Sequence, residues 1–240
     1  MKAAIAMWRN PRMMVTTAVV AAIYAAAQIT LNAFGFVIIP GVLGFKIADI
    51  FTMFFSVVFG PAGAFGVGFG NIIGDYFGGG LAIGSFFGFL STFAIGYVGY
   101  TFWLRLRSDS STTIHQVIVY LGAGVVSAAA CAVILGWGLE VLRIAPFAII
   151  SNTIVVNFVI GSWVGGVFYM LLYPRLKSLG LTWTDVMDPQ DIGKAHFAVL
   201  GAALIVAGAF GGWIFGAFFS SGMLIVGICF AVLILGALLV

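Results

Sequence analysis

The chain has 240 residues, of which 63% are hydrophobic and only 7% are charged. Since a soluble domain carries about 25% charged residues, this composition excludes a soluble globular protein and predicts a polytopic membrane protein. The net charge of +3 is too small to indicate nucleic-acid binding. The long apolar runs do not alternate with period two, so we expect an all-α bundle rather than a β-barrel.

The first predicted span covers residues 14–34 and follows Asn10-Pro11, a pair typical of a helix start. Its alanines recur four residues apart on two neighbouring rows. Small residues at this spacing let two membrane helices approach closely, either within the bundle or against a separate membrane subunit. The two rows consist of Ala18, Ala22 and Ala26, and of Ala21 and Ala25.

Residues 46–80 are predicted to form a helical hairpin around which the other spans pack. The sequence Gly60-Pro61-Ala62-Gly63 interrupts the apolar run, because proline ends a helix and glycine permits a tight reversal. Each arm is shorter than the roughly 20 residues that a membrane-spanning helix needs. Antiparallel arms would bring Asp49 and Asp75 to one side of the membrane. The glycine-rich apolar loop before the hairpin, residues 35–44, could fold over the bundle as a lid.

Five further spans follow, over residues 81–104, 117–139, 146–173, 195–215 and 222–240. We therefore expect a six-span substrate-binding bundle over residues 1–177, a polar cytoplasmic loop over residues 178–194, and two additional transmembrane helices over residues 195–240. With the N-terminus inside, Lys46 and Arg143 lie outside and the other eight of the ten basic residues lie in the cytoplasm. This distribution obeys the positive-inside rule.

Ionisable groups collect at the expected outer face, where groups at membrane depth usually face the bundle interior or a partner. Asp49 lies three residues after Lys46. Arg143 lies three residues after Glu140. This spacing allows each pair to be a local ion pair on a helix, and ligand contact is the alternative. Asp75 caps the third span or, one turn after an asparagine, binds a ligand.

Amide and aromatic groups extend the candidate site, and each has a structural alternative. Trp137 could stack on a ligand ring or anchor the bundle at the membrane interface. The asparagines of the sixth span could bridge helices or bind ligand. The ten candidate substrate-binding residues are Lys46, Asp49, Asn71, Asp75, Tyr76, Trp137, Glu140, Arg143, Asn152 and Asn157.

No catalytic or cofactor motif accompanies these residues. His115 and His196 have no Cys or His partner at metal-ligand spacing. Cys131 and Cys229 lie inside apolar runs, as buried small hydrophobic residues do. No phosphate-binding loop, HExxH motif or Ser–His–Asp arrangement occurs. We therefore expect no enzymatic activity, no metal and no cofactor, and any ATP-driven transport needs an ATPase on another chain.

Residues 12–177 resemble the S component, the substrate-binding membrane subunit, of energy-coupling factor (ECF) transporters. One feature is the pair of alanine rows in the first span. Another is the hairpin from Lys46-Ile-Ala-Asp-Ile through Gly60-Pro61 to Asn71-Ile-Ile-Gly-Asp75. The third is the asparagine-bearing sixth span, which ends in Tyr-Pro-Arg-Leu-Lys. The two C-terminal spans are additional to the six-helix plan of that family.

The resemblance implies high-affinity capture of a vitamin or related micronutrient from outside the cell. It implies docking through the alanine rows onto a membrane coupling subunit that carries two ATPase subunits. It also implies a multi-pass protein of a prokaryotic plasma membrane with both termini in the cytoplasm. The mixed charges suit a zwitterionic or polar heterocyclic ligand, and a cobalamin-like ligand and a queuosine-type precursor remain equal alternatives.

The competing hypothesis is an autonomous secondary transporter or channel for a small polar solute. Such proteins often contain paired broken helices in two repeated halves. The Gly60-Pro61 break has no counterpart after residue 120, which disfavours this alternative.

Overall fold

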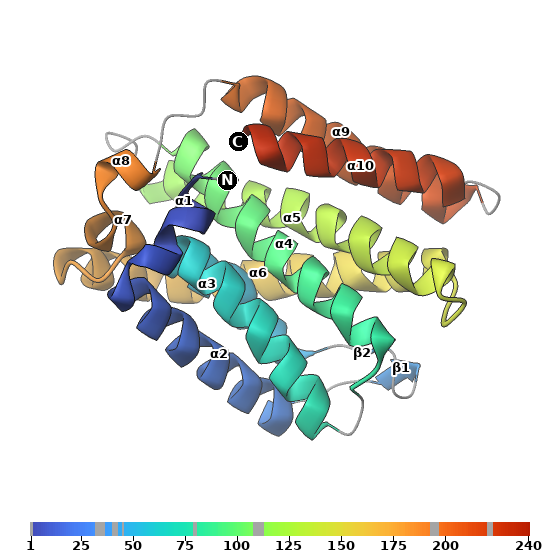
Figure 1. Cartoon of the computed structure of the whole chain (residues 1–240), viewed down its shortest axis with the longest axis horizontal. Helices are drawn as coiled ribbons and strands as arrows, with labels where there is room; N and C mark the ends of the chain where they lie inside the picture. Colours follow the sequence, from blue (N-terminus) through green and yellow to red (C-terminus); the bar gives the residue numbers. More distant parts are fainter. Residues whose placement is uncertain are drawn as a thin grey trace.

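The computed structural model describes residues 2–31, 37–39, 43–44, 46–78, 81–107, 113–192, 197–219 and 223–240. These residues form an all-α polytopic bundle, which confirms the predicted fold class (Figure 1). Of the described helices, six are long and apolar enough to cross a membrane, and α10 is a shorter apolar helix. The six long helices are α2 (Pro11–Leu31), α3 (Ile50–Phe77), α4 (Ile83–Leu106), α5 (Thr113–Val141), α6 (Phe147–Ser178) and α9 (Ala198–Phe218), and the shorter α10 covers Met223–Leu239.

Short elements close the two ends of the bundle. One end carries α1 (Lys2–Ala6), the 3₁₀ turn η1 (Met7–Arg9), α7 (Trp183–Val186) and α8 (Pro189–Ile192). The other end carries β1 (Val37–Ile39), paired antiparallel with β2 (Leu43–Gly44), and the 3₁₀ turn η3 (Ile47–Asp49) (Figure 1). The predicted lid, residues 35–44, lies outside the described residues except for these two strands.

Helix α3 contains the predicted hairpin. Gly60 has φ +56° and ψ −130°, a backbone conformation that glycine adopts readily and that breaks the helix. A continuous helix of 28 residues would hold its ends about 40 Å apart. Instead the Lys46 ammonium, just before α3, lies 3.5 Å from the Asp75 carboxylate near its end. The two arms, residues 50–59 and 61–77, therefore fold back on each other, as the sequence predicted.

Helix α2 runs parallel to the second arm of α3. Three glycines of that arm, four residues apart, contact successive turns of α2: Gly66 meets Val20, Gly70 meets Tyr24 and Gly74 meets Gln28. The absence of side chains at these positions brings the two helix backbones close together. Helix α2 begins at Pro11, directly after Asn10, as the sequence predicted. The Asn10 side-chain oxygen caps it by accepting hydrogen bonds from the N–H groups of Arg12 and Met13.

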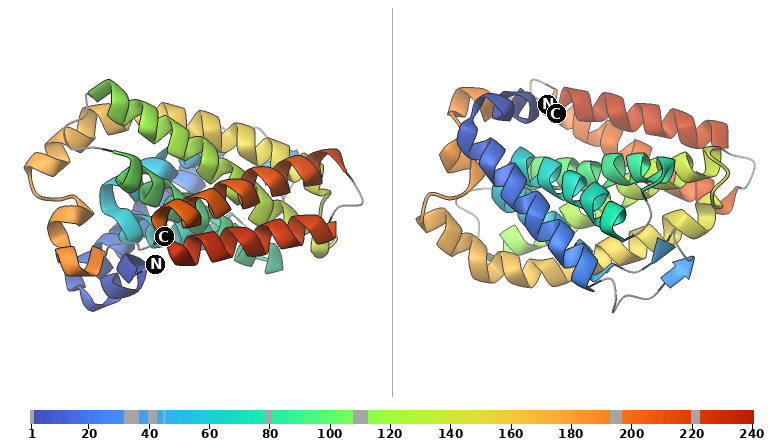
Figure 2. Two further views of the ribbon diagram at one scale, coloured as in Figure 1. Left: turned by 90° about the horizontal axis from the view of Figure 1, so that it is seen from above. Right: turned by 60° about the horizontal axis from the view of Figure 1, so that its bottom comes forward.

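With the two arms of α3 counted separately, the described helices make eight passes between the two ends of the bundle. These passes are α2, the two arms of α3, α4, α5, α6, α9 and α10. An even number of passes returns the chain to its starting side, and the two termini lie close together (Figures 1 and 2). The turn of the hairpin lies at that same end. A Cβ at Gly60 would collide with the ring of Trp183, the buried first residue of α7.

The additional helices α9 and α10 pack against each other and along α5. Trp137 of α5 contacts the Phe230 ring of α10, with the ring centroids 5.4 Å apart. The C-terminal end of α10 is tied to α4, since the Tyr97 hydroxyl donates to the Ala237 carbonyl oxygen over 2.8 Å. These contacts place the pair on the side of the bundle away from α2 (Figure 2).

Candidate functional site

A cluster of polar side chains occupies the end of the bundle opposite the hairpin turn. Lys46 donates to the Asn71 Oδ1 atom over 3.2 Å and pairs with Asp75 over 3.5 Å. Asn71 in turn donates to the second Asp75 oxygen over 3.3 Å. The side chains of Lys46 and Asp75 are 31% and 20% exposed, whereas Asn71 is 4% exposed. The cluster therefore reaches from the edge of the bundle into its interior.

Asp49 forms the deepest part of the cluster. It lies in η3, is only 2% exposed, and accepts two hydrogen bonds. The Tyr24 hydroxyl donates to its Oδ1 atom over 2.6 Å, and the Asn157 amide donates to its Oδ2 atom over 2.5 Å. Because Tyr24 comes from α2 and Asn157 from α6, one carboxylate joins three segments of the bundle.

Gln28 completes the cluster from α2. Its Nε2 atom donates to the Asp75 Oδ1 atom over 2.9 Å. Asp75 thus accepts hydrogen bonds from Asn71 and Gln28 and forms an ion pair with Lys46, and these three residues lie on different segments. Carboxylates that accept several hydrogen bonds in a partly dehydrated setting are held in one orientation, as a binding site requires.

The sequence predicted five members of this cluster: Lys46, Asp49, Asn71, Asp75 and Asn157. It missed Tyr24 and Gln28, the two residues that α2 contributes. A signal for both was present in the spacing. They lie four residues apart and two residues after Ala22 and Ala26, so they face the opposite side of the same helix.

The other five predicted site residues lie elsewhere. Tyr76 is exposed and contacts Phe77 rather than the cluster. Trp137 packs against α10, as described above. Asn152 accepts a hydrogen bond over 3.0 Å from the indole N–H of Trp213 and so joins α6 to α9. The asparagines of α6 therefore divide, since Asn152 bridges helices and Asn157 belongs to the cluster.

Glu140 and Arg143 organise the connection from α5 to α6 and do not pair with each other. The Glu140 Oε2 atom accepts a hydrogen bond over 2.6 Å from the N–H of Phe147, the first residue of α6. Arg143 has φ +56° and is exposed. Its N–H donates to the Glu140 carbonyl oxygen, and the next N–H donates to Leu139, which is the Schellman arrangement at a helix end.

The two alanine rows of α2 face different surroundings. Ala21 and Ala25 are buried, and they lie on the side that packs against α3. Ala18, Ala22 and Ala26 are exposed on the outward side. We call these three residues the alanine face. Ala21 and Ala25 serve packing within the chain, and of the two rows only the alanine face is open to a second molecule.

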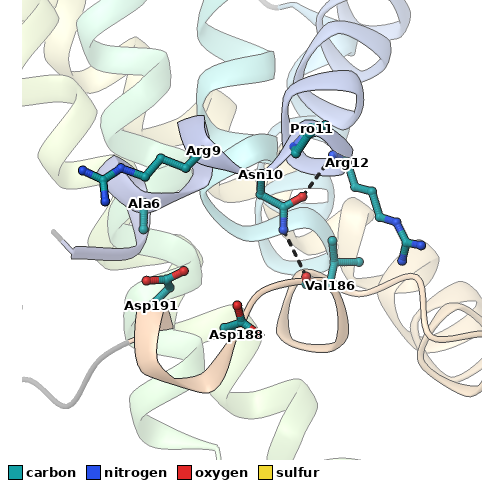
Figure 3. Close-up of a pocket in the computed structure, with 8 residues that line it drawn as sticks. All are labelled: Ala6, Arg9, Asn10, Pro11, Arg12, Val186, Asp188 and Asp191. Atoms are coloured by element: carbon teal, nitrogen blue, oxygen red, sulfur yellow. Dashed lines mark hydrogen bonds between the residues drawn. The ribbon is translucent and has the colours of Figure 1, made fainter.

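A shallow surface pocket opens at the other end of the bundle, beside α1 and α8 (Figure 3). The Asn10 amide spans it by donating to the Val186 carbonyl oxygen over 3.2 Å, while its oxygen caps α2. Lys2 donates to the Gln190 carbonyl oxygen over 2.6 Å. These bonds fasten the N-terminal segment to the α7–α8 segment. The pocket is lined by Ala6, Arg9, Asn10, Pro11, Arg12, Val186, Asp188 and Asp191.

Among the described residues, no three His, Cys, Asp or Glu side chains gather as metal ligands would. The polar cluster instead offers carboxylate acceptors, asparagine and glutamine side-chain amides and one ammonium donor. These are groups that recognise the hydrogen-bonding edges of a polar organic molecule.

The family model described as QueT transporter matches residues 14–174. The matched region runs from α2 through most of α6 and contains every residue of the polar cluster, whereas α9 and α10 lie beyond it. No curated protein and no solved structure matches the chain.

Proposed function

The chain belongs to the QueT transporter family, whose members are ECF S components, and from this premise we propose that it captures a queuosine precursor. The family confirms the resemblance that the sequence suggested and makes the chain a multi-pass membrane transport protein with a small-molecule substrate. The proposal concerns the substrate, the site that binds it and the partners. The proposal assigns no catalytic reaction to this chain.

The polar cluster around Asp75 and Asp49 is the observation that supports this proposal. Queuosine precursors are 7-deazaguanines, which present N–H donors next to a carbonyl acceptor on one edge of a planar base. Carboxylates accept such donors, and an ammonium or amide group donates to the carbonyl. Lys46, Asn71 and Asp75 hold both kinds of group within one set of hydrogen bonds. The glycine-rich helices beside them would allow a flat ligand to lie close to backbone.

We propose the alanine face as the surface that docks onto the ATP-driven partner subunits. ATP-driven import through this chain requires a membrane coupling subunit and two ATPases on other chains. Three exposed alanines four residues apart form a smooth strip against which another helix packs closely. In this proposal residues 1–177 bind substrate and dock, residues 178–194 cover the cytoplasmic end, and residues 195–240 support α5.

The orientation follows from the basic residues. Helices α4 and α6 carry basic residues in their last turns, at the end that also holds α1 with Lys2 and η1 with Arg9. Cytoplasmic ends carry the excess of Lys and Arg. We therefore place both termini in the cytoplasm of a prokaryotic cell and the polar cluster at the outer face, where the substrate arrives.

The first test is binding by the purified full chain. Isothermal titration in detergent with 7-aminomethyl-7-deazaguanine should give tight binding at one site per chain. Asp75→Ala removes the carboxylate that contacts Lys46, Asn71 and Gln28, and it should weaken binding about 10-fold to 100-fold, the range expected for charge-assisted hydrogen bonds. Asp191→Ala, at the far end of the bundle, is the matched control and should leave affinity unchanged.

Two results would overturn the proposal. One is the absence of binding for every 7-deazaguanine tested, together with no such compound released from the gently purified protein on denaturation. The other is uptake driven by an ion gradient in vesicles that contain this chain alone, which would indicate a secondary transporter.

A further inference from the structure

We propose that Gln28 is a substrate-contacting residue and that its amide oxygen accepts a hydrogen bond from a substrate N–H group. This inference rests on the proposed function and extends it, since it names the residue of α2 that distinguishes substrates by a hydrogen-bond donor. The alanine face lies on the opposite side of the same helix.

The amide of Gln28 is buried and only half satisfied. The residue is 2% exposed, and its Nε2 atom donates to Asp75 over 2.9 Å. Its Oε1 atom is buried and accepts no hydrogen bond from any residue that the structure describes. Buried side-chain acceptors almost always have a partner, so an exception within a polar cluster points to a ligand.

The orientation of this amide is fixed by charge. If the oxygen and nitrogen exchanged places, the Gln28 oxygen would face the Asp75 carboxylate, and two acceptors would oppose each other. The nitrogen must therefore point to Asp75, which leaves the oxygen as the group without a partner. Asp75 also accepts a hydrogen bond from Asn71 and pairs with the Lys46 ammonium, so both of its oxygens already have partners.

The position of the amide is fixed by the backbone of α3. A Cβ built on Gly74 would lie 2.5 Å from the Gln28 Cδ atom and 2.7 Å from its Oε1 atom. The glycine thus makes room for the amide beside the helix, and any larger residue would displace it. Gln28 is held between the Gly74 backbone and Asp75, which is the pre-organisation that a specificity-determining acceptor needs.

A site with such an acceptor discriminates against a ligand that lacks the matching donor, because the oxygen then stays unpaired in the complex. Removal of the acceptor should abolish this discrimination. A residue that only positioned Asp75 would behave differently, since its loss would weaken all ligands by the same factor.

The experiment compares ligand ratios in two variants. The probes are 7-aminomethyl-7-deazaguanine and its analogues that lack one donor each: the 2-deamino, N1-methyl and N9-methyl compounds. In the unaltered chain we expect one analogue to bind about 10-fold to 100-fold more weakly than the parent. In Gln28→Met, which keeps the length of the side chain, that ratio should fall to within about threefold of unity. Gln190→Met, in α8 at the far end, is the control and should keep the full ratio.

Gly74→Ala provides a second, independent variant in which Gln28 is displaced but not replaced. It should lose the same discrimination, and alanine suits a helix, so this variant tests the inference even if Gln28→Met fails to fold. Equal weakening of all four probes, or unchanged ratios, would refute the role of Gln28 while tight binding of the parent compound upheld the proposed function. If the unaltered chain bound none of the probes, both proposals would fall together.

Discussion

The hydrogen bond from Tyr24 to Asp49 should be among the more stabilising side-chain contacts of the bundle. Asp49 is buried and accepts only from Tyr24 and Asn157 among the described residues, over 2.6 and 2.5 Å. Tyr24→Phe removes the hydroxyl and leaves one carboxylate oxygen without its donor. Hydrogen bonds to charged groups contribute about 1.5–3 kcal/mol. We therefore expect the free energy of unfolding to fall by about 2 kcal/mol, and the thermal midpoint in detergent by about 4–8 °C.

The chain offers a matched control in Tyr97→Phe. The Tyr97 hydroxyl is also buried and joins two helices, but its acceptor is the neutral Ala237 carbonyl oxygen. A bond of that kind contributes about 1 kcal/mol, so the midpoint should fall by about half as much. In an Asp49→Asn background the cost of Tyr24→Phe should shrink toward the control value. Equal losses at both tyrosines, or no loss at Tyr24, would refute the argument from the buried carboxylate.

Three further variants test the assignments at other places in the bundle. Ala22→Trp adds a bulky group to the exposed alanine face, so substrate binding should be unchanged and transport with the ATPase partners should be lost. The control Val199→Trp, at an exposed position of α9, should affect neither binding nor transport. Normal uptake by Ala22→Trp would refute the docking role of the alanine face. Asn152→Leu removes the acceptor of Trp213; stability should fall by about 1 kcal/mol with unchanged affinity, and weaker substrate binding would return this residue to the site. Arg143→Gly relieves a left-handed backbone position and should raise stability by up to about 1 kcal/mol, again with unchanged affinity; a loss of affinity would show that the arginine contacts substrate.

Two pairs of oppositely charged residues show that spacing along one segment does not decide which residues pair. Both Lys46 with Asp49 and Glu140 with Arg143 have the three-residue spacing of a helical ion pair. In the structure neither pair forms. Lys46 turns to Asp75, which the hairpin brings within 3.5 Å, and Glu140 accepts from the start of α6. Spacing along one segment suggested ion pairs, but each partner came from the segment that follows: the second arm of α3 for Lys46 and the start of α6 for Glu140.

The alanine rows show the same limit on a single helix. Composition and spacing identified α2 as a helix with small residues on two adjacent rows, and the periodicity of an α-helix guaranteed that both rows exist. Which row would be covered depended on where the second arm of α3 lies. Its glycines meet Val20, Tyr24 and Gln28, so Ala21 and Ala25 lie on the covered side and Ala22 stays exposed.

Reasoning from the residues alone was enough to predict the membrane class, the helical bundle, the hairpin at Gly60-Pro61 and the return of the chain to its starting side. These follow from hydropathy, chain length per span and the backbone limits of glycine and proline, all of which act locally. The packed bundle was needed to show that Tyr24 and Gln28 join the two aspartates and that Trp137 and Asn152 face the additional helices. Those outcomes depend on the rotation of each helix about its axis, which is set by side-chain packing between segments distant in sequence.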